Sequence, residues 1–263
     1  MKISVFYAFP RSGGTLVNRC LGCISGNVVL SEINPHASVI APEQQACEWL
    51  SLISSEEVNA LRDQSYLQKI RYLAQKACDR QLHLVVRDWP AVNFLGDVFI
   101  QDVLVPSYVL EQEIYLLQGG FEYRSAAITR KSEDVYTSIM KSFAEKSPEK
   151  FRFLSATDFG ERYLQFAKSI SGHRIFHYED ICDNPEAQIK ELCEYLEIQY
   201  DASFLNNFKY FDRCTGDSHP DVASRGFKLD VIKRLESHVS SEYYISAQQD
   251  EFCREANRML SYG

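Results

Sequence analysis

This sequence lacks a long apolar run, an excess of basic residues and a recognisable export signal, and each absence excludes a class of protein. The longest stretch without Asp, Glu, Lys or Arg covers residues 20–31, which is well short of the ~18 apolar residues that a membrane-spanning helix needs. Lysine and arginine together number 28 against 36 acidic residues, for a net charge of −8. We therefore expect no membrane span. We also expect no broad surface for nucleic acid, because binding it requires an extended positive surface.

The start of the chain and its cysteines indicate the compartment. Met1 and Lys2 lead directly into an apolar stretch, without the basic segment, apolar core and cleavage site of a secretory signal. We expect a soluble, cytoplasmic protein whose eight cysteines are reduced thiols. Cys20 and Cys23 form the one close pair, and no second pair or histidine cluster accompanies it. Two buried thiols on a helix are therefore favoured over zinc, and no metal is expected.

The order of the remaining segments predicts the fold. Apolar runs alternate with segments of helical periodicity, and no internal repeat is present. We expect strands at residues 3–8, 28–30, 82–86, 125–129 and 174–178, and helices at about 15–23, 132–143, 158–170, 185–196 and 228–262. This alternation predicts an α/β protein with a three-layer, P-loop-type fold and a central parallel sheet. We expect a single domain over residues 1–263 with a helical insertion at about 42–81, while residues 91–120 carry no firm pattern.

Two serines mark expected helix starts. Ser54 is followed three residues later by Glu57, which is typical of a capping box within the insertion. Ser132 precedes two acidic residues and is expected to cap the helix that follows the fourth strand.

A glycine turn joins the first expected strand to the first expected helix, in the order Phe9-Pro10-Arg11-Ser12-Gly13-Gly14-Thr15-Leu16. Adjacent glycines let the backbone bend so that successive N–H groups point into one concavity, and the helix adds the positive end of its dipole. Such a loop binds anions. Compared with the nucleotide-binding pattern G-x-x-x-x-G-K-[ST], Gly14 replaces the lysine, which argues against phosphoryl transfer from ATP. Arg11 remains as the cation.

Polar residues follow two of the expected strands. Glu32 comes just after residues 28–30, and Asp88 just after residues 82–86. Ligand sites in open α/β sheets lie at the carboxyl ends of the strands, so both carboxylates are expected near the glycine turn. His36, a few residues after Glu32, is a third candidate for a general base.

Two motifs, in this order, resemble the sulfotransferases that use 3′-phosphoadenosine 5′-phosphosulfate (PAPS). Residues 10–16 are similar to the family's 5′-phosphosulfate loop, P-[KR]-S-G-T-T, with Gly14 in place of the first threonine. Arg130 and Ser138 resemble the 3′-phosphate motif, in which an arginine ends a strand and a serine follows eight positions later; the family's frequent proline is Ser132 here. An arginine at a strand end and a serine about two helical turns along can converge on one phosphate.

Two later segments also resemble this family. Residues 176–181, followed by Pro185 and Glu186, are similar to its R-Y-E-D-L segment and P-E pair, with His177 in place of the arginine. The family's tyrosine in this segment contacts the adenine, which makes Tyr178 a candidate. Residues 224–226, Ser-Arg-Gly, are similar to an arginine-glycine element that closes on the 3′-phosphate. The sequence has an arginine in the first loop and a glutamate about twenty residues later. This pattern looks closer to that of the bacterial and protein-tyrosine sulfotransferases than to that of the cytosolic steroid and phenol sulfotransferases.

The resemblance implies transfer of the sulfuryl group of PAPS to an acceptor hydroxyl or amine, with release of 3′-phosphoadenosine 5′-phosphate and without a metal. Glu32 matches the family's glutamate base, and Arg11 would also stabilise charge on the departing phosphate. A transferring sulfuryl group carries less negative charge than a phosphoryl group, so one arginine and oriented amides can suffice. The residues implied to bind the cofactor are Arg11, Ser12, Gly13, Gly14, Thr15, Leu16, Arg130, Ser138, Tyr178, Arg225 and Gly226.

The sequence leaves other functions and assignments open. A P-loop kinase would use residues 82–88 as a strand that ends in a Mg²⁺-binding Asp88, although the missing lysine counts against it. A non-catalytic nucleotide-binding module of the same fold would keep the anion sites and leave Glu32 without a chemical role. Asp88 and His36 are the rivals of Glu32 as the base. No motif indicates which small molecule or peptide is the acceptor. The oligomeric state is open as well.

Overall fold

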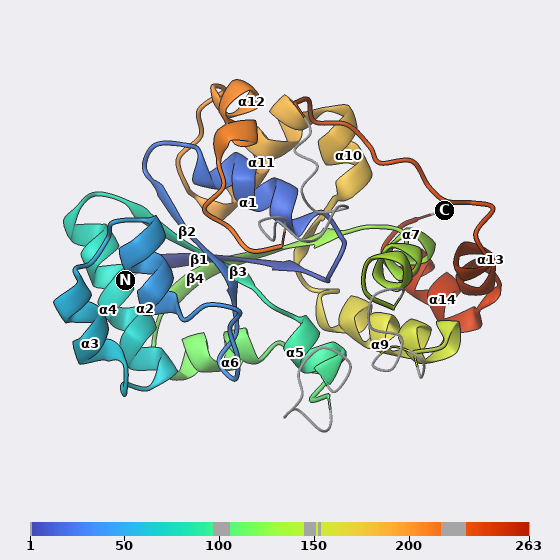
Figure 1. Ribbon diagram of the computed structural model, residues 1–263, viewed down its shortest axis with the longest axis horizontal. Helices are drawn as coiled ribbons and strands as arrows, with labels where there is room; N and C mark the ends of the chain where they lie inside the picture. Colours follow the sequence, from blue (N-terminus) through green and yellow to red (C-terminus); the bar gives the residue numbers. More distant parts are fainter. Residues whose placement is uncertain (1, 97–105, 145–150, 152–153, 217–229, 263) are drawn as a thin grey trace.

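The computed structural model describes residues 2–96, 106–144, 151, 154–216 and 230–262 (Figure 1). In this part of the chain five parallel strands form one sheet, in the order β2-β3-β1-β4-β5. The strands are β1 Lys2–Ala8, β2 Asn27–Ile33, β3 His83–Asp88, β4 Glu122–Thr129 and β5 Arg174–His177. The chain adds strands first on one side of β1 and later on the other, so the crevice typical of ligand sites opens at the carboxyl end of β1.

All five predicted strands are present, and three of them end at a different residue. β2 continues to Ile33 and so includes Glu32, which was expected to follow it. β3 continues through Arg87 and Asp88, which were expected to follow the strand. β5 stops at His177, so Tyr178 is the first residue of a helix and not the last residue of a strand. The differences at β3 and β5 change which way these side chains point, because successive residues of a strand face opposite sides of the sheet.

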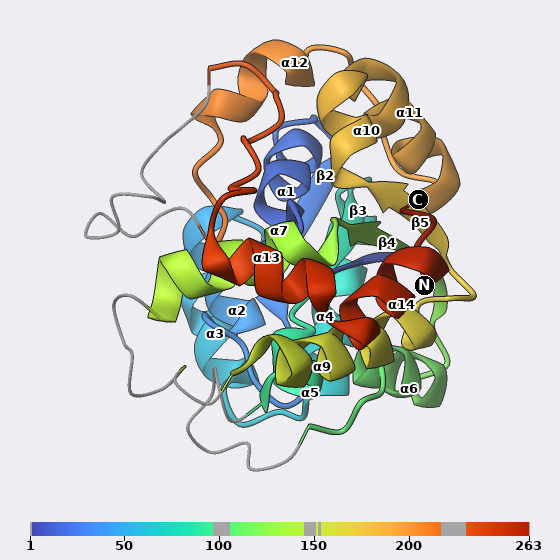
Figure 2. The same ribbon diagram turned by 90° about the vertical axis from the view of Figure 1, so that its right-hand side faces the viewer.

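Helices cover both faces of the sheet (Figures 1 and 2). On one face lie α1 Gly14–Gly22, α10 Tyr178–Asp183, α11 Pro185–Leu196, α12 Phe204–Asn207 and the 3₁₀ turn η4 Phe208–Tyr210. On the other face lie α4 Tyr66–Asp79, α5 Ala91–Phe94, α6 Glu111–Gln118 and α9 Ala156–Ser169. The predicted three-layer α/β architecture with a parallel sheet is confirmed.

The segment between β2 and β3 is helical, as the sequence predicted for residues 42–81. It contains α2 Pro42–Gln44, the π-helix η1 Gln45–Trp49, α3 Ser55–Leu61 and α4. The capping box predicted at the start of α3 is confirmed, because the Ser54 hydroxyl accepts a hydrogen bond from the Glu57 N–H and the Glu57 carboxylate accepts one from the Ser54 N–H. This pair satisfies two backbone donors at the helix start.

The remaining helices lie beside β4, at the end of the sheet where the C-terminus is drawn in Figure 1. They are α7 Ser132–Ile139, the π-helix η3 Met140–Ala144, α13 Glu242–Gln249 and α14 Glu251–Met259. The prediction that Ser132 caps α7 is wrong. Lys131 occupies the capping position without a side-chain bond, and the Ser132 hydroxyl donates to Glu133 and to the Cys253 carbonyl. The prediction of a helical tail from residue 228 is also wrong in part, because no helix is present over residues 230–241.

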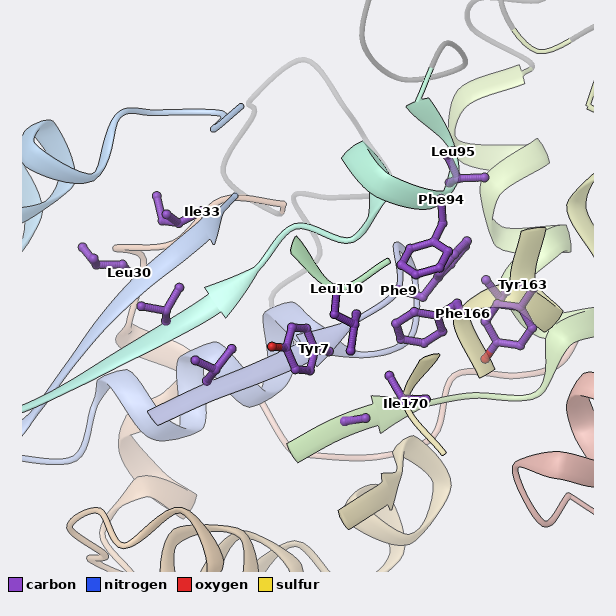
Figure 3. Packing of buried hydrophobic residues seen from close by; sticks show 14 of the residues in the cluster. Tyr7, Phe9, Leu30, Ile33, Phe94, Leu95, Leu110, Tyr163, Phe166 and Ile170 are labelled. Atoms are coloured by element: carbon purple, nitrogen blue, oxygen red, sulfur yellow. The ribbon is translucent and has the colours of Figure 1, made fainter. Parts of the chain in front are cut away.

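Two hydrophobic clusters, one on each face of the sheet, hold these layers together. The cluster under α9 is rich in aromatic rings, and Figure 3 shows Phe9 enclosed by Phe94, Tyr163 and Phe166. The Phe9 ring lies 5.0 Å from that of Tyr163 and 5.2 Å from that of Phe166, within the range of favourable aromatic pairs. Because Phe9 directly follows β1, this packing fixes the point at which the chain leaves the sheet and enters the glycine turn.

None of the helices in the described ranges is long and apolar enough to cross a membrane. Across the same residues, no group of three or more His, Cys, Asp or Glu side chains is placed to hold a metal ion.

Candidate functional site

The glycine turn after β1 has a backbone geometry suited to an anion. α1 begins at Gly14, and its capping residue Gly13 has a φ of 93°, a conformation that favours glycine. Arg11 also has a positive φ, of 71°, which is uncommon for a residue with a side chain. The Ser12 N–H donates to the Phe9 carbonyl at 3.0 Å and tightens the turn. The first N–H groups of α1 have no partner within the helix, so they are available to an anion at this end.

Arg11 joins this loop to the second predicted motif. Its Nε donates a hydrogen bond of 2.8 Å to the Ser138 Oγ, although the two residues are 127 positions apart in sequence. Ser138 lies on α7, which follows β4 directly after Arg130 and Lys131. The loop after β1 and the helix after β4 therefore meet at the same edge of the sheet.

Tyr178 lies between the loop and Arg130. A Cβ atom on Gly13 would come within 2.5 Å of the Tyr178 ring, so only glycine fits against it. On the same ring, the Arg130 guanidinium carbon is 4.7 Å from the centroid, in cation–π range. The Tyr178 hydroxyl accepts a hydrogen bond of 3.1 Å from the Leu235 N–H. The Tyr178 ring therefore supports both the glycine turn and Arg130, and its contact with an adenine stays a prediction.

Arg130 is a buried cation at the end of β4. It is 6% exposed, and its Nη2 lies 3.8 Å from the Asp134 carboxylate one turn along α7. Its Nε has no hydrogen-bond partner among the described residues, and neither has the Thr137 hydroxyl on α7. Buried polar atoms are nearly always paired, so these two indicate a place where a ligand can bind.

Glu32 stands at a distortion of β2. From Leu30 to Ile33 the strand advances three residues while its partner β3 advances two, from Val86 to Asp88, which defines a β-bulge. Glu32 itself has a φ of 53°. Bulges and positive φ values at residues other than glycine are found preferentially at functional sites, where they redirect a side chain.

Arg87 links Glu32 to the loop and was missed in the sequence. Its Nη2 donates to the Glu32 carboxylate at 3.0 Å, and its Nη1 approaches the Thr215 carbonyl at 3.4 Å. A Cβ atom on Gly14 would lie 3.0 Å from the Arg87 Nε, so the guanidinium covers the position from which a nucleotide-binding loop would present its lysine. The available signal was a charged residue inside a buried strand, since β3 reads His-Leu-Val-Val-Arg-Asp.

Asp88 and His36 are placed differently from Glu32. Val85 belongs to the cluster under α1 and Val86 to the opposite one, so alternation puts Arg87 on the face of the loop and Asp88 on the far face. There Asp88 is buried and accepts a hydrogen bond of 3.3 Å from the Asn34 side chain. The half-exposed His36 ring pairs with Glu111 at the start of α6.

The other predicted residues of the loop pack closely. Ser12 is fully buried, and Leu16 packs against the cluster under α1. The Thr15 Oγ1 would lie 2.5 Å from a Cβ on Gly216, so the chain passes directly over the start of α1 before residue 217. Arg225 and Gly226 lie outside the described residues.

The fold is shown by comparison with solved structures. The sulfotransferase domain from the curacin biosynthetic pathway aligns over 100% of this chain and 98% of its own length, with a TM-score of 0.62 and 16% sequence identity. The sulfotransferase domain from the Synechococcus PCC 7002 olefin synthase aligns over 99% and 94%, with a TM-score of 0.59 and 16% identity. No protein-family model and no curated protein sequence matches the chain. The chain therefore has the fold of sulfotransferase domains, and the fold predicted from its sequence is confirmed.

Proposed function

We propose that this protein is a PAPS-dependent sulfotransferase that transfers a sulfuryl group in line to a hydroxyl or amine of a small-molecule or peptide acceptor. One observation carries the proposal: the 2.8 Å hydrogen bond from Arg11 to Ser138, which joins the two motifs that resemble the 5′-phosphosulfate loop and the 3′-phosphate motif. A fold hosts many activities, so the assignment depends on these side chains and not on the architecture.

The residues at this edge fit a nucleotide with phosphate groups at the 3′ and 5′ positions of its ribose. A Cβ on Gly14 would lie 2.6 Å from the Ala8 side chain and one on Gly13 would meet Tyr178, so the backbone forms a cradle without side chains. In this proposal Arg11, Ser12 and the amides of residues 13–16 hold the 5′-phosphosulfate. Arg130 and Ser138 hold the 3′-phosphate, a role that Arg225 and Gly226 share only by resemblance.

When bound, PAPS supplies the sulfuryl group for transfer. Glu32 takes the proton of the acceptor hydroxyl on a carboxylate oxygen, since it stands beside the loop at the carboxyl edge of the sheet. Arg87 holds that carboxylate at 3.0 Å and, together with Arg11, places positive charge where the leaving phosphate gains negative charge. No metal is assigned a role.

The position of Asp88 supports this chemistry over a kinase. A P-loop kinase needs its strand-end aspartate on the side of the loop, where it holds Mg²⁺. Asp88 shares the face of Val86, away from the loop, and Arg87 takes the place beside the glycines.

Thermal unfolding with 3′-phosphoadenosine 5′-phosphate, compared with ADP in the presence and absence of Mg²⁺, tests the nucleotide. Ligand at a hundredfold excess over its dissociation constant adds about 2.7 kcal/mol, which raises the melting temperature of a chain this size by roughly 5–10 °C. We expect the bisphosphate to act without Mg²⁺. A shift with ADP and Mg²⁺ alone would favour a kinase and contradict the roles of Arg130 and Ser138.

Glu32→Gln tests the base. We expect transfer of ³⁵S from PAPS to a panel of hydroxyl and amine acceptors to fall by about 10²–10⁴-fold, with little change in bisphosphate affinity. Glu43→Gln is the matched control, because Glu43 is also ion-paired, with Lys69 at 2.7 Å, but lies in the insertion. Full transfer by the Glu32 variant would refute the assignment; bisphosphate binding without transfer by the wild-type protein would indicate a non-catalytic module.

A further inference from the structure

A side chain outside both motifs completes the edge of the sheet beside Glu32. β2 is the edge strand of the described sheet, so the outward backbone groups of Ser31 have no strand beside them. Gln45 occupies that position. Its Oε1 accepts from the Ser31 N–H at 2.7 Å, and its Nε2 donates to the Ser31 carbonyl at 2.8 Å. One amide side chain thus makes the pair of bonds that a neighbouring strand would make.

Gln45 is itself held firmly. It is fully buried, and its Nε2 also donates to the Ile40 carbonyl at 2.9 Å. It is the first residue of the π-helix η1, where its own carbonyl accepts from the Leu50 N–H, five residues on. π-helical turns are rare and occur frequently at functional sites. This wide turn lies directly against β2.

The side chain of Ser31 is held from another direction. Its hydroxyl shares a hydrogen bond of 2.8 Å with the Thr215 hydroxyl and accepts one of 3.1 Å from the Thr215 N–H. Both residues are buried, at 0% and 4% exposure. Ser31 is therefore fixed through its backbone by Gln45 and through its side chain by Thr215, which come from opposite halves of the sequence.

The residue fixed in this way immediately precedes Glu32. The positive φ of Glu32 is unfavourable for a residue with a side chain, and such conformations persist only where the surroundings enforce them. We propose that Gln45 and Thr215 are positioning residues, which hold the bulge at Ser31 and so aim the Glu32 carboxylate at the acceptor. This inference rests on the proposed function, in which Glu32 is the base.

Gln45→Met tests the first half of this role, since methionine has a similar length and forms none of the three hydrogen bonds. We expect kcat to fall by about 10²-fold, because small misplacements of a reacting group have effects of that size. Affinity for the bisphosphate should stay within twofold. Hydrogen exchange of the Ser31 amide should accelerate, which reports the lost bond independently of turnover. Gln112→Met is the matched control, a buried glutamine on α6 whose partner is Tyr66.

A double variant separates positioning from general destabilisation. If Gln45 acts through Glu32, Gln45→Met added to Glu32→Gln lowers the residual turnover no further. If Gln45→Met lowers the turnover of the Glu32→Gln variant by as large a factor as it lowers that of the wild type, the proposal is overturned.

Thr215 supplies a second test that stays informative if Gln45→Met fails to fold. Thr215→Val keeps the shape and removes the hydroxyl, and should lower kcat about tenfold, while Thr215→Ser keeps the hydroxyl and restores turnover. If the wild-type enzyme is active and the folded Gln45 and Thr215 variants keep its full turnover, the positioning role is overturned and the proposed function stands. A wild-type protein that binds no bisphosphate and transfers no sulfuryl group refutes the proposed function, and the positioning role with it.

Discussion

Asp88 places a carboxyl group where ionisation is unfavourable, so removing that group should stabilise the protein. Asp88 is 1% exposed, and its Oδ2 has no hydrogen-bond partner among the described residues. Burial raises the pKa of Asp88 from 3.8 to about 8, and the negative charges of Glu111 and Glu113 act in the same direction. Hydrogen bonds from the Asn34 side chain and the Trp89 N–H favour the charged form and offset only part of this increase.

The sign and size of the effect follow from linkage. Because the folded-state pKa of Asp88 is raised, the unfolded chain releases this proton at lower pH, and stability is lost as pH rises from about 4 to about 8. One pKa unit corresponds to about 1.36 kcal/mol, so the loss amounts to about 2 kcal/mol at pH 5 and about 4 kcal/mol at pH 7. Asp88→Asn keeps the shape without the titration. Its advantage over the wild type should therefore be about 2–3 kcal/mol larger at pH 7 than at pH 5.

Urea denaturation of both proteins at pH 5, 6, 7 and 8 measures this difference in the free energy of unfolding. Asp201→Asn is the control. Asp201 is exposed and its pKa is lowered by hydrogen bonds from Ser203, so its carboxylate is ionised in folded and unfolded chains throughout this range and the difference should stay constant. An advantage of Asp88→Asn that is the same at pH 5 and pH 8 would refute the reasoning.

Two further substitutions test the proposed anion site. Gly13→Ala should lower the free energy of unfolding by about 1–3 kcal/mol and weaken bisphosphate binding, because its Cβ would lie 2.5 Å from the Tyr178 ring at a φ of 93°. Thermal unfolding with and without the bisphosphate measures both effects. Wild-type values for both would contradict the packing of Tyr178 on Gly13. Ser138→Ala removes the acceptor of the Arg11 hydrogen bond and should weaken 3′-phosphoadenosine 5′-phosphate about tenfold more than AMP, since AMP lacks the 3′-phosphate. Calorimetric titration measures both affinities, and an equal loss for the two nucleotides would argue against a 3′-phosphate at Ser138.

Much of the fold could be predicted because its signals are local. A buried parallel strand is a nearly continuous apolar run, and all five runs form strands. Glycines at a strand end predict an anion-binding turn, and the separation of Arg130 from Ser138 is set by the rise of a helix. These parts of the site depend on short stretches of sequence that can be interpreted one at a time.

The rest depends on contacts between distant residues. Nothing near Gln45 or Thr215 indicates that both bind Ser31, which lies 14 residues from the first and 184 from the second. Arg87 was passed over because the strand was expected to end before it, and one residue of extra strand decides which face a side chain takes. Ser132 failed as a cap for a similar reason, since its partners on α14 are supplied by tertiary packing.

The packing of Tyr178 on Gly13 also determines when, during translation, the glycine turn gains its support. The glycine turn is among the first segments to leave the ribosome, but the Tyr178 ring that supports it is made more than half a chain later, after Arg130, which the ring also contacts. A growing chain that has reached β3 carries the loop without its support, and domains complete their long-range contacts only when the last partner is available. The proposed nucleotide would therefore stabilise the nearly finished protein and offer little to the early nascent chain.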